Sequence, residues 1–138
     1  MKYIVNSLEE TEKLAKDFAK ELKIGQVVLL NGDLGAGKTT FTQFVFSYLG
    51  VKDVVTSPTF AILKSYKGNE CLLHHFDMYR IGEEEAIESG FDEILGDRNS
   101  IIFIEWSENA ASLLPKETIC VNIKLLADDK REFEIKYE

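Results

Sequence analysis

Eight consecutive residues near the start of the sequence have the side chains and spacing needed to bind a chain of phosphates. Residues 32–39 read GDLGAGKT and match the P-loop pattern G-x-x-x-x-G-K-[S/T]. Glycines lack a Cβ, so the backbone can take positive φ and turn its N–H groups inward, where they and the start of a following helix bind phosphate. Lys38 would reach the β- and γ-phosphates, and the Thr39 hydroxyl would bind Mg²⁺. The motif predicts nucleotide binding but does not say what the energy is used for.

A second candidate site follows a short apolar run. Residues 101–104, IIFI, are followed by Glu105 and Trp106. A buried strand beside the P-loop strand often ends in an acid that holds Mg²⁺ or its water. Glu105 is therefore the predicted metal-binding acid. Trp106, the only tryptophan, would either pack against the nucleotide site or fill the core.

A third group of polar side chains follows the strand predicted over residues 71–76. Asp77, at a strand end beside a P-loop, could order Mg²⁺ through water or orient the attacking water. Arg80 could pair with Asp77 or with phosphate, and a purely structural Asp77–Arg80 pair is the alternative. His74 and His75 are adjacent, so on a strand they point to opposite faces. This argues against a shared metal site and favours packing or hydrogen bonding.

The segments around these residues fit the elements that must position them. Residues 26–30, QVVLL, are typical of a buried parallel strand. After the loop, apolar side chains recur at helical spacing until Gly50 ends the predicted helix. Residues 56–60, TSPTF, form a shaped loop that enters a strand over 60–66. In P-loop proteins such a loop can sense the γ-phosphate, and an ordinary strand entry is the alternative.

The first helix is predicted from its start signal. Residues 7–10, SLEE, form a capping box with Ser7 at the N-cap and Glu10 three residues on. An amphipathic pattern continues until Gly25 stops it. Thr11 lies in the first turn, where the pattern predicts a solvent-facing side chain.

The complete pattern predicts an α/β fold of P-loop NTPase type. A mixed, mainly parallel sheet around residues 27–30 and 101–104 would be flanked by helices, with antiparallel hairpins added over 60–76 and 119–137. The second hairpin is expected at the edge of the sheet. A helix beginning near residue 83 should break at Gly90 and be followed by a short helical turn. Residues 1–138 are expected to form one domain.

Composition narrows the class of protein. The chain is 45% hydrophobic and 29% charged, as in ordinary soluble proteins. It has no apolar run near the ~20 residues that span a bilayer, and its start does not resemble a signal peptide. Two widely spaced cysteines, Cys71 and Cys120, are expected to be buried thiols in a reducing compartment, which predicts a cytoplasmic protein. The net charge of −8 argues against direct nucleic-acid binding, although a partner could provide it.

The sequence also favours one nucleotide. It has neither Asn-Lys-x-Asp nor Asp-x-x-Gly, which GTPases use, so ATP is favoured. It has three arginines and no obvious lid insertion, whereas a small-metabolite kinase needs several arginines around the transferred group. ATP hydrolysis used as a conformational timer therefore fits better. A small-metabolite kinase and a non-catalytic nucleotide-gated adaptor stay as alternatives.

Four segments together resemble one known family. They are residues 32–40, residues 57–60, the run His75-x-Asp77-x-Tyr79-Arg80 and the run Ile104-Glu105-Trp106. They occur in the order and spacing of TsaE, the small P-loop ATPase of bacterial tRNA threonylcarbamoyladenosine biosynthesis, and the resemblance extends from about Ser7 to the terminal hairpin.

The resemblance implies a function and a set of site residues. TsaE proteins bind ATP and Mg²⁺ and associate with the TsaB–TsaD pair, in which TsaD transfers the threonylcarbamoyl group to the adenosine beside the tRNA anticodon. TsaE would act as a weak ATPase, stimulated by its partners, that supports repeated turnover and meets tRNA only through the complex. The implied catalytic residues are Asp77, Lys38 and Glu105, and the implied metal ligands are Thr39 and Glu105. The implied nucleotide-binding residues are Thr11, Asp33, Leu34, Gly35, Ala36, Gly37, Lys38, Thr39, Thr40, Thr59 and Arg131.

Overall fold

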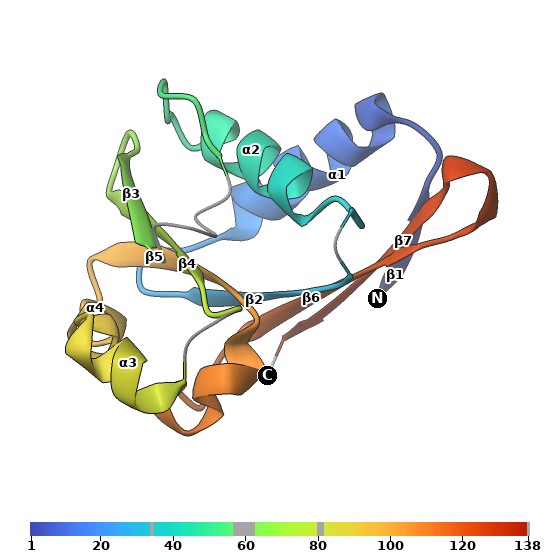
Figure 1. Cartoon of the computed structure of the whole chain (residues 1–138). Helices are drawn as coiled ribbons and strands as arrows, with labels where there is room; N and C mark the ends of the chain where they lie inside the picture. Colours follow the sequence, from blue (N-terminus) through green and yellow to red (C-terminus); the bar gives the residue numbers. More distant parts are fainter. Residues whose placement is uncertain (34, 57–62, 80–81, 138) are drawn as a thin grey trace.

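A computed structural model describes residues 1–33, 35–56, 63–79 and 82–137 (Figure 1). In this part of the chain, seven strands form one sheet in the order β1-β7-β6-β2-β5-β4-β3. The strands are β1 Lys2–Val5, β2 Val27–Asn31, β3 Leu63–Lys67, β4 Leu72–Asp77, β5 Ser100–Glu105, β6 Ile119–Leu125 and β7 Arg131–Tyr137. The helices are α1 Leu8–Glu21, α2 Lys38–Tyr48, α3 Glu83–Glu88 and α4 Phe91–Leu95, and 3₁₀ segments cover Ser107–Leu113 and Ala127–Asp129.

The centre of the sheet is parallel. β2 pairs in parallel with β5 and with β6, and β4 pairs in parallel with β5. The β3–β4, β6–β7 and β1–β7 pairs are antiparallel. The predicted mixed, mainly parallel sheet with two antiparallel hairpins is therefore confirmed. The carboxyl ends of β2, β5 and β4 meet at one edge, the usual place for ligand binding in such sheets.

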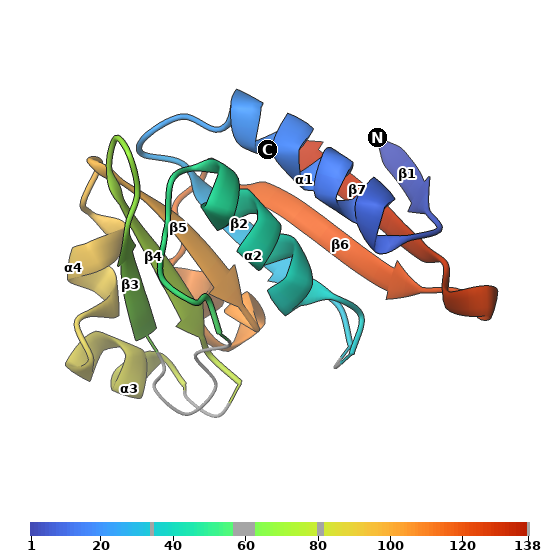
Figure 2. The same ribbon diagram turned by 90° about the horizontal axis from the view of Figure 1, so that it is seen from above.

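Helices cover both faces of the sheet. Figures 1 and 2 show α1 and α2 on one face and α3 and α4 on the other. The first layer packs through buried aromatic rings that include Phe18, Phe41, Phe46, Phe103 and Phe133. The second buries Phe76, Met78, Phe91, Ile102 and Ile104. Each such side chain removed from water contributes about 1.5–3 kcal/mol, so the two layers stabilise the central strands.

Local signals place the helix ends as the sequence predicted. Ser7 caps α1 by accepting a hydrogen bond from the Glu10 N–H at 3.2 Å, and the Glu10 carboxylate accepts from the Asn6 N–H at 3.1 Å. Gly90, at φ 86°, separates α3 from α4. Because a left-handed residue interrupts the helical ladder, the acidic segment forms two short helices rather than one long helix.

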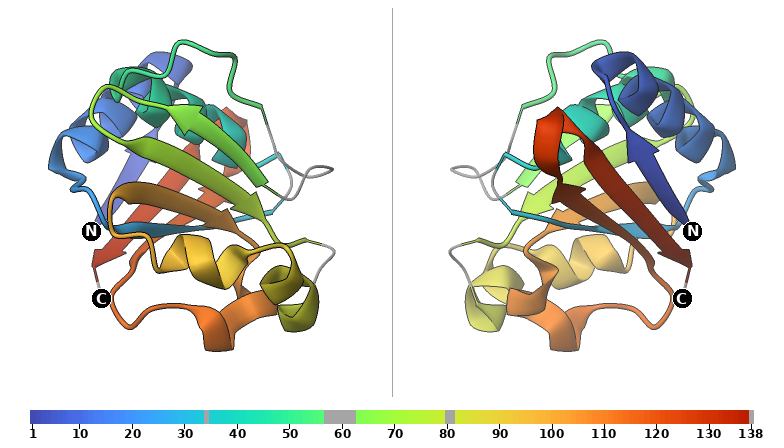
Figure 3. Two further views of the ribbon diagram at one scale, coloured as in Figure 1. Left: turned by 90° about the vertical axis from the view of Figure 1, so that its left-hand side faces the viewer. Right: turned by 90° about the vertical axis from the view of Figure 1, so that its right-hand side faces the viewer.

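One expectation about the sheet edge is wrong. The hairpin of β6 and β7 was expected at the edge, but β1 lies outside it and pairs with β7, with Tyr3 opposite Phe133. The Met1 ammonium group donates a hydrogen bond to the Ile135 carbonyl oxygen at 3.1 Å. In the right-hand view of Figure 3, β1 (blue) lies beside β7 (red). A strand of four residues has too short a pattern to specify its partner from sequence, because strand order depends on distant contacts.

No helix in the described residues is long and apolar enough to cross a membrane.

Candidate functional site

The loop between β2 and α2 is shaped by two glycines. A Cβ on Gly32 would lie 2.6 Å from the Ile123 carbonyl oxygen, so only glycine lets the loop start this close to β6. Gly37 has φ 107° and immediately precedes α2, with no side chain to cap the helix. The N–H groups at the start of α2 are therefore not occupied by a capping side chain and could bind an anion.

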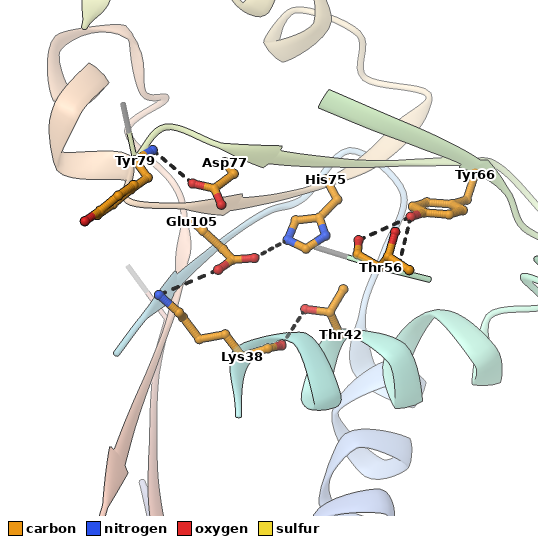
Figure 4. Close-up of polar contacts among 8 residues, drawn as sticks. All are labelled: Lys38, Thr42, Thr56, Tyr66, His75, Asp77, Tyr79 and Glu105. Atoms are coloured by element: carbon orange, nitrogen blue, oxygen red, sulfur yellow. Dashed lines mark hydrogen bonds and ion pairs between the residues drawn. The ribbon is translucent and has the colours of Figure 1, made fainter. Parts of the chain in front are cut away.

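Lys38 extends from the first turn of α2 into a buried site (Figure 4). Its Nζ lies 3.6 Å from Oε1 of Glu105, and the two side chains are only 6% and 5% exposed. The same Nζ lies 4.5 Å from the ring centroid of Trp106, which provides a cation–π contact. Thr42 Oγ1 donates to the Lys38 carbonyl oxygen at 2.9 Å and fixes the first turn. The ammonium is thus held where a phosphate could replace its present partners.

Glu105 is bound on its other oxygen by a histidine. His75 Nε2 lies 2.7 Å from Glu105 Oε2, and the His75 side chain is completely buried. Burial tends to raise the pKa of Glu105, but the hydrogen bond from His75 and the charges beside the carboxylate, including Lys38, outweigh it and lower the pKa below its usual value. The carboxyl group is therefore held as a carboxylate, the form that binds a metal.

Asp77 lies next to Glu105 on the neighbouring parallel strand. The two residues are direct partners in the β4–β5 register, so their side chains emerge at the same level on the same face. Asp77 is buried, and its Oδ1 accepts the Tyr79 N–H at 2.9 Å. The Tyr79 ring packs against Trp106 with centroids 4.9 Å apart. The sheet therefore brings two carboxylates together beside the phosphate-binding loop.

The donor set fits a metal that is shared with a phosphate ligand. Among the described residues, no group of three or more His, Cys, Asp or Glu side chains could hold a metal by itself. Mg²⁺ commonly takes one or two protein oxygens and completes its octahedral shell with phosphates and waters. Thr39, half-buried at the start of α2, and the carboxylate of Glu105 could supply those oxygens.

The β6–β7 turn also reaches the loop. Arg131 Nε donates to the Ala36 carbonyl oxygen at 2.9 Å, and a Cβ on Gly37 would lie 3.2 Å from that nitrogen. Arg131 is 95 residues distant from Ala36 in sequence, yet the structure places the two in contact. Asp33 is exposed, whereas Ala36 is buried and Thr40 is half-buried.

Thr11 differs from the expectation drawn from helical pattern. It was expected to face solvent, but only 4% of it is exposed, and its Oγ1 donates to the Ser7 carbonyl oxygen at 3.2 Å. The hydroxyl therefore bonds within α1. Figure 2 nevertheless shows the start of α1, the loop before α2 and the β6–β7 turn on the same side of the molecule. Leu34, Thr59 and Arg80, which the sequence analysis also selected, lie outside the described residues.

Comparison with known proteins identifies the family. Residues 5–133 match the family model described as "Threonylcarbamoyl adenosine biosynthesis protein TsaE". The chain belongs to the TsaE family.

Individual relatives agree with this assignment. The TsaE of Rickettsia bellii is 47% identical over 93% of this chain and 89% of its own length. The TsaE of Bacillus subtilis is 42% identical over 90% of this chain and 77% of its own length. The crystal structure of Bacillus subtilis YdiB superposes with a TM-score of 0.82 at 36% identity, covering 99% of this chain and 83% of that one. The YdiB structure therefore shares the described fold over nearly the whole chain.

Within this member of the TsaE family, sequence reasoning gave His75 no specific role. It predicted packing or hydrogen bonding for the two histidines and separated them onto opposite faces, and the structure confirms both points. His74 bonds Ser65 Oγ at 2.7 Å on one face, while His75 faces Glu105 on the other. The available signal was the spacing from His75 to Asp77, because residues two apart on a strand share a face.

Proposed function

We propose that this chain is an Mg²⁺-dependent ATP-binding subunit with weak ATPase activity. It would support threonylcarbamoyl transfer by the TsaB–TsaD complex to the adenosine beside the tRNA anticodon. The buried contact between Lys38 and Glu105, directly beside a P-loop in a TsaE-family chain, is the observation that carries the proposal. Burying two charged side chains costs hydration free energy, and a role of Lys38 in phosphate binding explains why the pair is present.

The residues of the loop would bind the triphosphate. The N–H groups of residues 33–37 and of the start of α2 would donate to phosphate oxygens, and Lys38 would turn its ammonium from Glu105 toward the β- and γ-phosphates. Thr40 and Arg131 would stand at the rim of this site, and Thr11 and Thr59 near the nucleotide.

Thr39 and Glu105 would hold Mg²⁺, with water and phosphate oxygens completing its shell. When bound, the ion neutralises charge that develops on the phosphate oxygens during transfer. Release of Lys38 toward phosphate would leave Glu105 Oε1 without its ammonium partner, and this oxygen would then face the metal site.

Asp77 would orient the attacking water. Its carboxylate lies level with Glu105, so it could accept a hydrogen bond from a water placed beside the γ-phosphate. The water oxygen bonds to the γ-phosphorus, the bond to the oxygen that bridges the β- and γ-phosphorus atoms breaks, and the products are ADP and inorganic phosphate.

The net charge and the cysteines of the chain support a proposal about where the protein works. We propose that residues 1–138 form one domain that works in the cytoplasm without a membrane. The net charge of −8 supports contact with tRNA only through the complex. Cys71 and Cys120 are half-buried and not joined in a disulfide, which is compatible with a reducing compartment.

The test is ATP hydrolysis by the purified chain, alone and with TsaB–TsaD, with and without Mg²⁺. Hydrolysis that the partners stimulate and that stops without Mg²⁺ would support the proposal. ATP bound but never hydrolysed would indicate a nucleotide-gated adaptor. ATP consumed only with a specific small acceptor would indicate a kinase.

Asp77→Ala separates hydrolysis from binding. Loss of the water-orienting carboxylate should lower hydrolysis roughly 10²–10⁴-fold while ATP affinity stays near that of the wild type. If the variant still supports full tRNA modification, the signal is ATP binding, and the adaptor function is the correct one.

A further inference from the structure

The two carboxylate oxygens of Glu105 have different partners, His75 and Lys38. Oε2 lies 2.7 Å from His75 Nε2, and Oε1 lies 3.6 Å from Lys38 Nζ. A carboxylate that is bound on one side cannot rotate freely about its terminal bond. The other oxygen is therefore directed toward the P-loop, as Figure 4 shows.

The histidine itself is held by the sheet and by α2. It is completely buried, stands opposite Phe103 in the β4–β5 register, and meets the Phe46 ring edge-to-face with centroids 6.2 Å apart. Glu105 is two residues beyond Phe103 on the same face of β5. The His75–Glu105 contact is therefore a diagonal contact between two rigid strands.

The position of the imidazole proton follows from the surroundings. A carboxylate only accepts hydrogen bonds, so Nε2 must carry the proton. Nδ1 is buried and has no hydrogen-bond partner among the described residues. A proton on Nδ1 would leave a buried donor unsatisfied, which is more costly than an unsatisfied acceptor on a ring already bonded through Nε2.

We propose that His75 is a positioning residue that orients Glu105 so that one carboxylate oxygen stays available to the metal site. The inference rests on the proposed function, since it concerns the same metal site. Without His75, the carboxylate of Glu105 could rotate about its terminal bond, and neither oxygen would be held in the direction of the metal site. Groups that orient a metal ligand in this way commonly change metal affinity or activity 10–100-fold.

Nucleotide binding tests this role without measuring hydrolysis. Affinity for a fluorescent ATP analogue is measured with Mg²⁺ and with EDTA, and the ratio gives the gain that Mg²⁺ provides. His75→Phe should reduce this gain roughly 10–100-fold and leave the affinity in EDTA almost unchanged. His75→Gln, whose amide N–H₂ can reach the same oxygen, should restore most of the gain.

The adjacent histidine provides a matched control. His74 bonds Ser65 on the opposite face of β4, so His74→Phe should leave the Mg²⁺ gain at the wild-type value. An unchanged gain in His75→Phe, or an equal loss with and without Mg²⁺ that His75→Gln does not rescue, would overturn the positioning role. A wild-type chain with no Mg²⁺ gain would instead overturn the proposed function.

Imidazole ¹⁵N spectra of the nucleotide-free chain test the geometry independently. We expect the His75 proton on Nε2, and a change in its chemical shift in Glu105→Gln. A His75 ring with no proton on Nε2 would overturn the inference, whether or not the chain binds ATP. Because this spectrum is recorded on the wild type, it remains decisive even if a His75 variant folds poorly.

Discussion

Glu105 and Glu134 each face two basic side chains, but they lie in different regions. Glu105 ends β5 inside the molecule, with Lys38 at 3.6 Å and His75 at 2.7 Å and a side chain that is 5% exposed. Glu134 lies on β7 near the outer edge of the sheet, with Lys136 at 3.5 Å and Lys2 at 4.0 Å and a side chain that is 26% exposed. A glutamate beside two basic side chains thus occurs once in the protein interior and once at the surface.

The difference in burial between Glu105 and Glu134 indicates why the inner charged group is present. Exposed ion pairs are screened by water and salt and change stability little. Buried ones lose hydration that their attraction often fails to recover, so apolar residues of similar shape would fold at least as well. The buried group of Lys38, His75 and Glu105 is therefore better explained by ligand binding than by stability.

The largest expected effect comes from removing the buried acid. Glu105→Ala leaves the Lys38 ammonium buried without its carboxylate and should destabilise the fold by about 3–5 kcal/mol, measured by urea unfolding. Glu134→Ala is the matched control and should unfold close to the wild type. Equal losses in both variants would remove the contrast between the two regions.

The next effect is on nucleotide affinity. Lys38→Ala removes the cation proposed to bind the phosphates and should weaken ATP binding roughly 10–100-fold by calorimetry, the range for one charged hydrogen bond. Lys136→Ala, on the exposed pair, should bind ATP as the wild type does. Unchanged affinity in Lys38→Ala would mean that the loop binds no phosphate.

The pH dependence of the unfolding free energy gives a further comparison of Glu105 with Glu134. The pKa of Glu105 is lowered by its partners against the effect of burial, so its contribution is fully present above its ordinary pKa of 4.5. That contribution is lost as the pH falls below 4.5 through the lower folded-state value. The difference in unfolding free energy between the wild type and Glu105→Gln should therefore shrink on acidification.

Glu134 gives the corresponding comparison at the surface. Its pKa is lowered first by a hydrogen bond from Asn122 and further by Lys136 and Lys2, so the sign of the pH dependence is the same. Its difference from Glu134→Gln should be smaller and should fade at 1 M salt, where exposed charges are screened. A salt-sensitive Glu105 contribution would show that water reaches the inner site.

The smallest expected effect concerns Arg131, which begins the exposed strand but contacts the loop. Arg131→Ala removes one hydrogen bond to the Ala36 carbonyl oxygen and should weaken ATP binding by about 0.5–1.5 kcal/mol. Arg98→Ala, at an exposed arginine beside the end of β5 opposite Glu105, is the control. A loss as large as that of Lys38→Ala would make Arg131 a main phosphate ligand.

Sequence patterns were sufficient for local structure, which depends on residues that are close together in the chain. The P-loop, the apolar run before Glu105 and the capping box of Ser7 and Glu10 were all visible, because loop, strand and cap signals are local. The parallel centre of the sheet followed from the two apolar runs around residues 27–30 and 101–104.

Contacts that depend on strand register were not predictable. His75 meets Glu105 only because β4 and β5 pair with one particular register, which places His75 opposite Phe103. Thr11 is buried because α1 packs with that turn inward, although its position in the helical pattern suggested solvent. The contact of Arg131 with Ala36 required the β6–β7 turn to reach the loop, and its residues alone did not indicate this.

The outer strand β1 also sets an order of events during synthesis. β1 pairs only with β7 among the described strands, with Lys2 opposite Glu134, so β1 cannot be paired before β7 has been made. Until β7 has been made, the backbone of β1 lacks its partner strand, whereas α1 can already pack against α2 through Phe18 and Phe41. Contacts across so many residues slow folding, and the unpaired edge of β1 is open to wrong pairing until β7 is available.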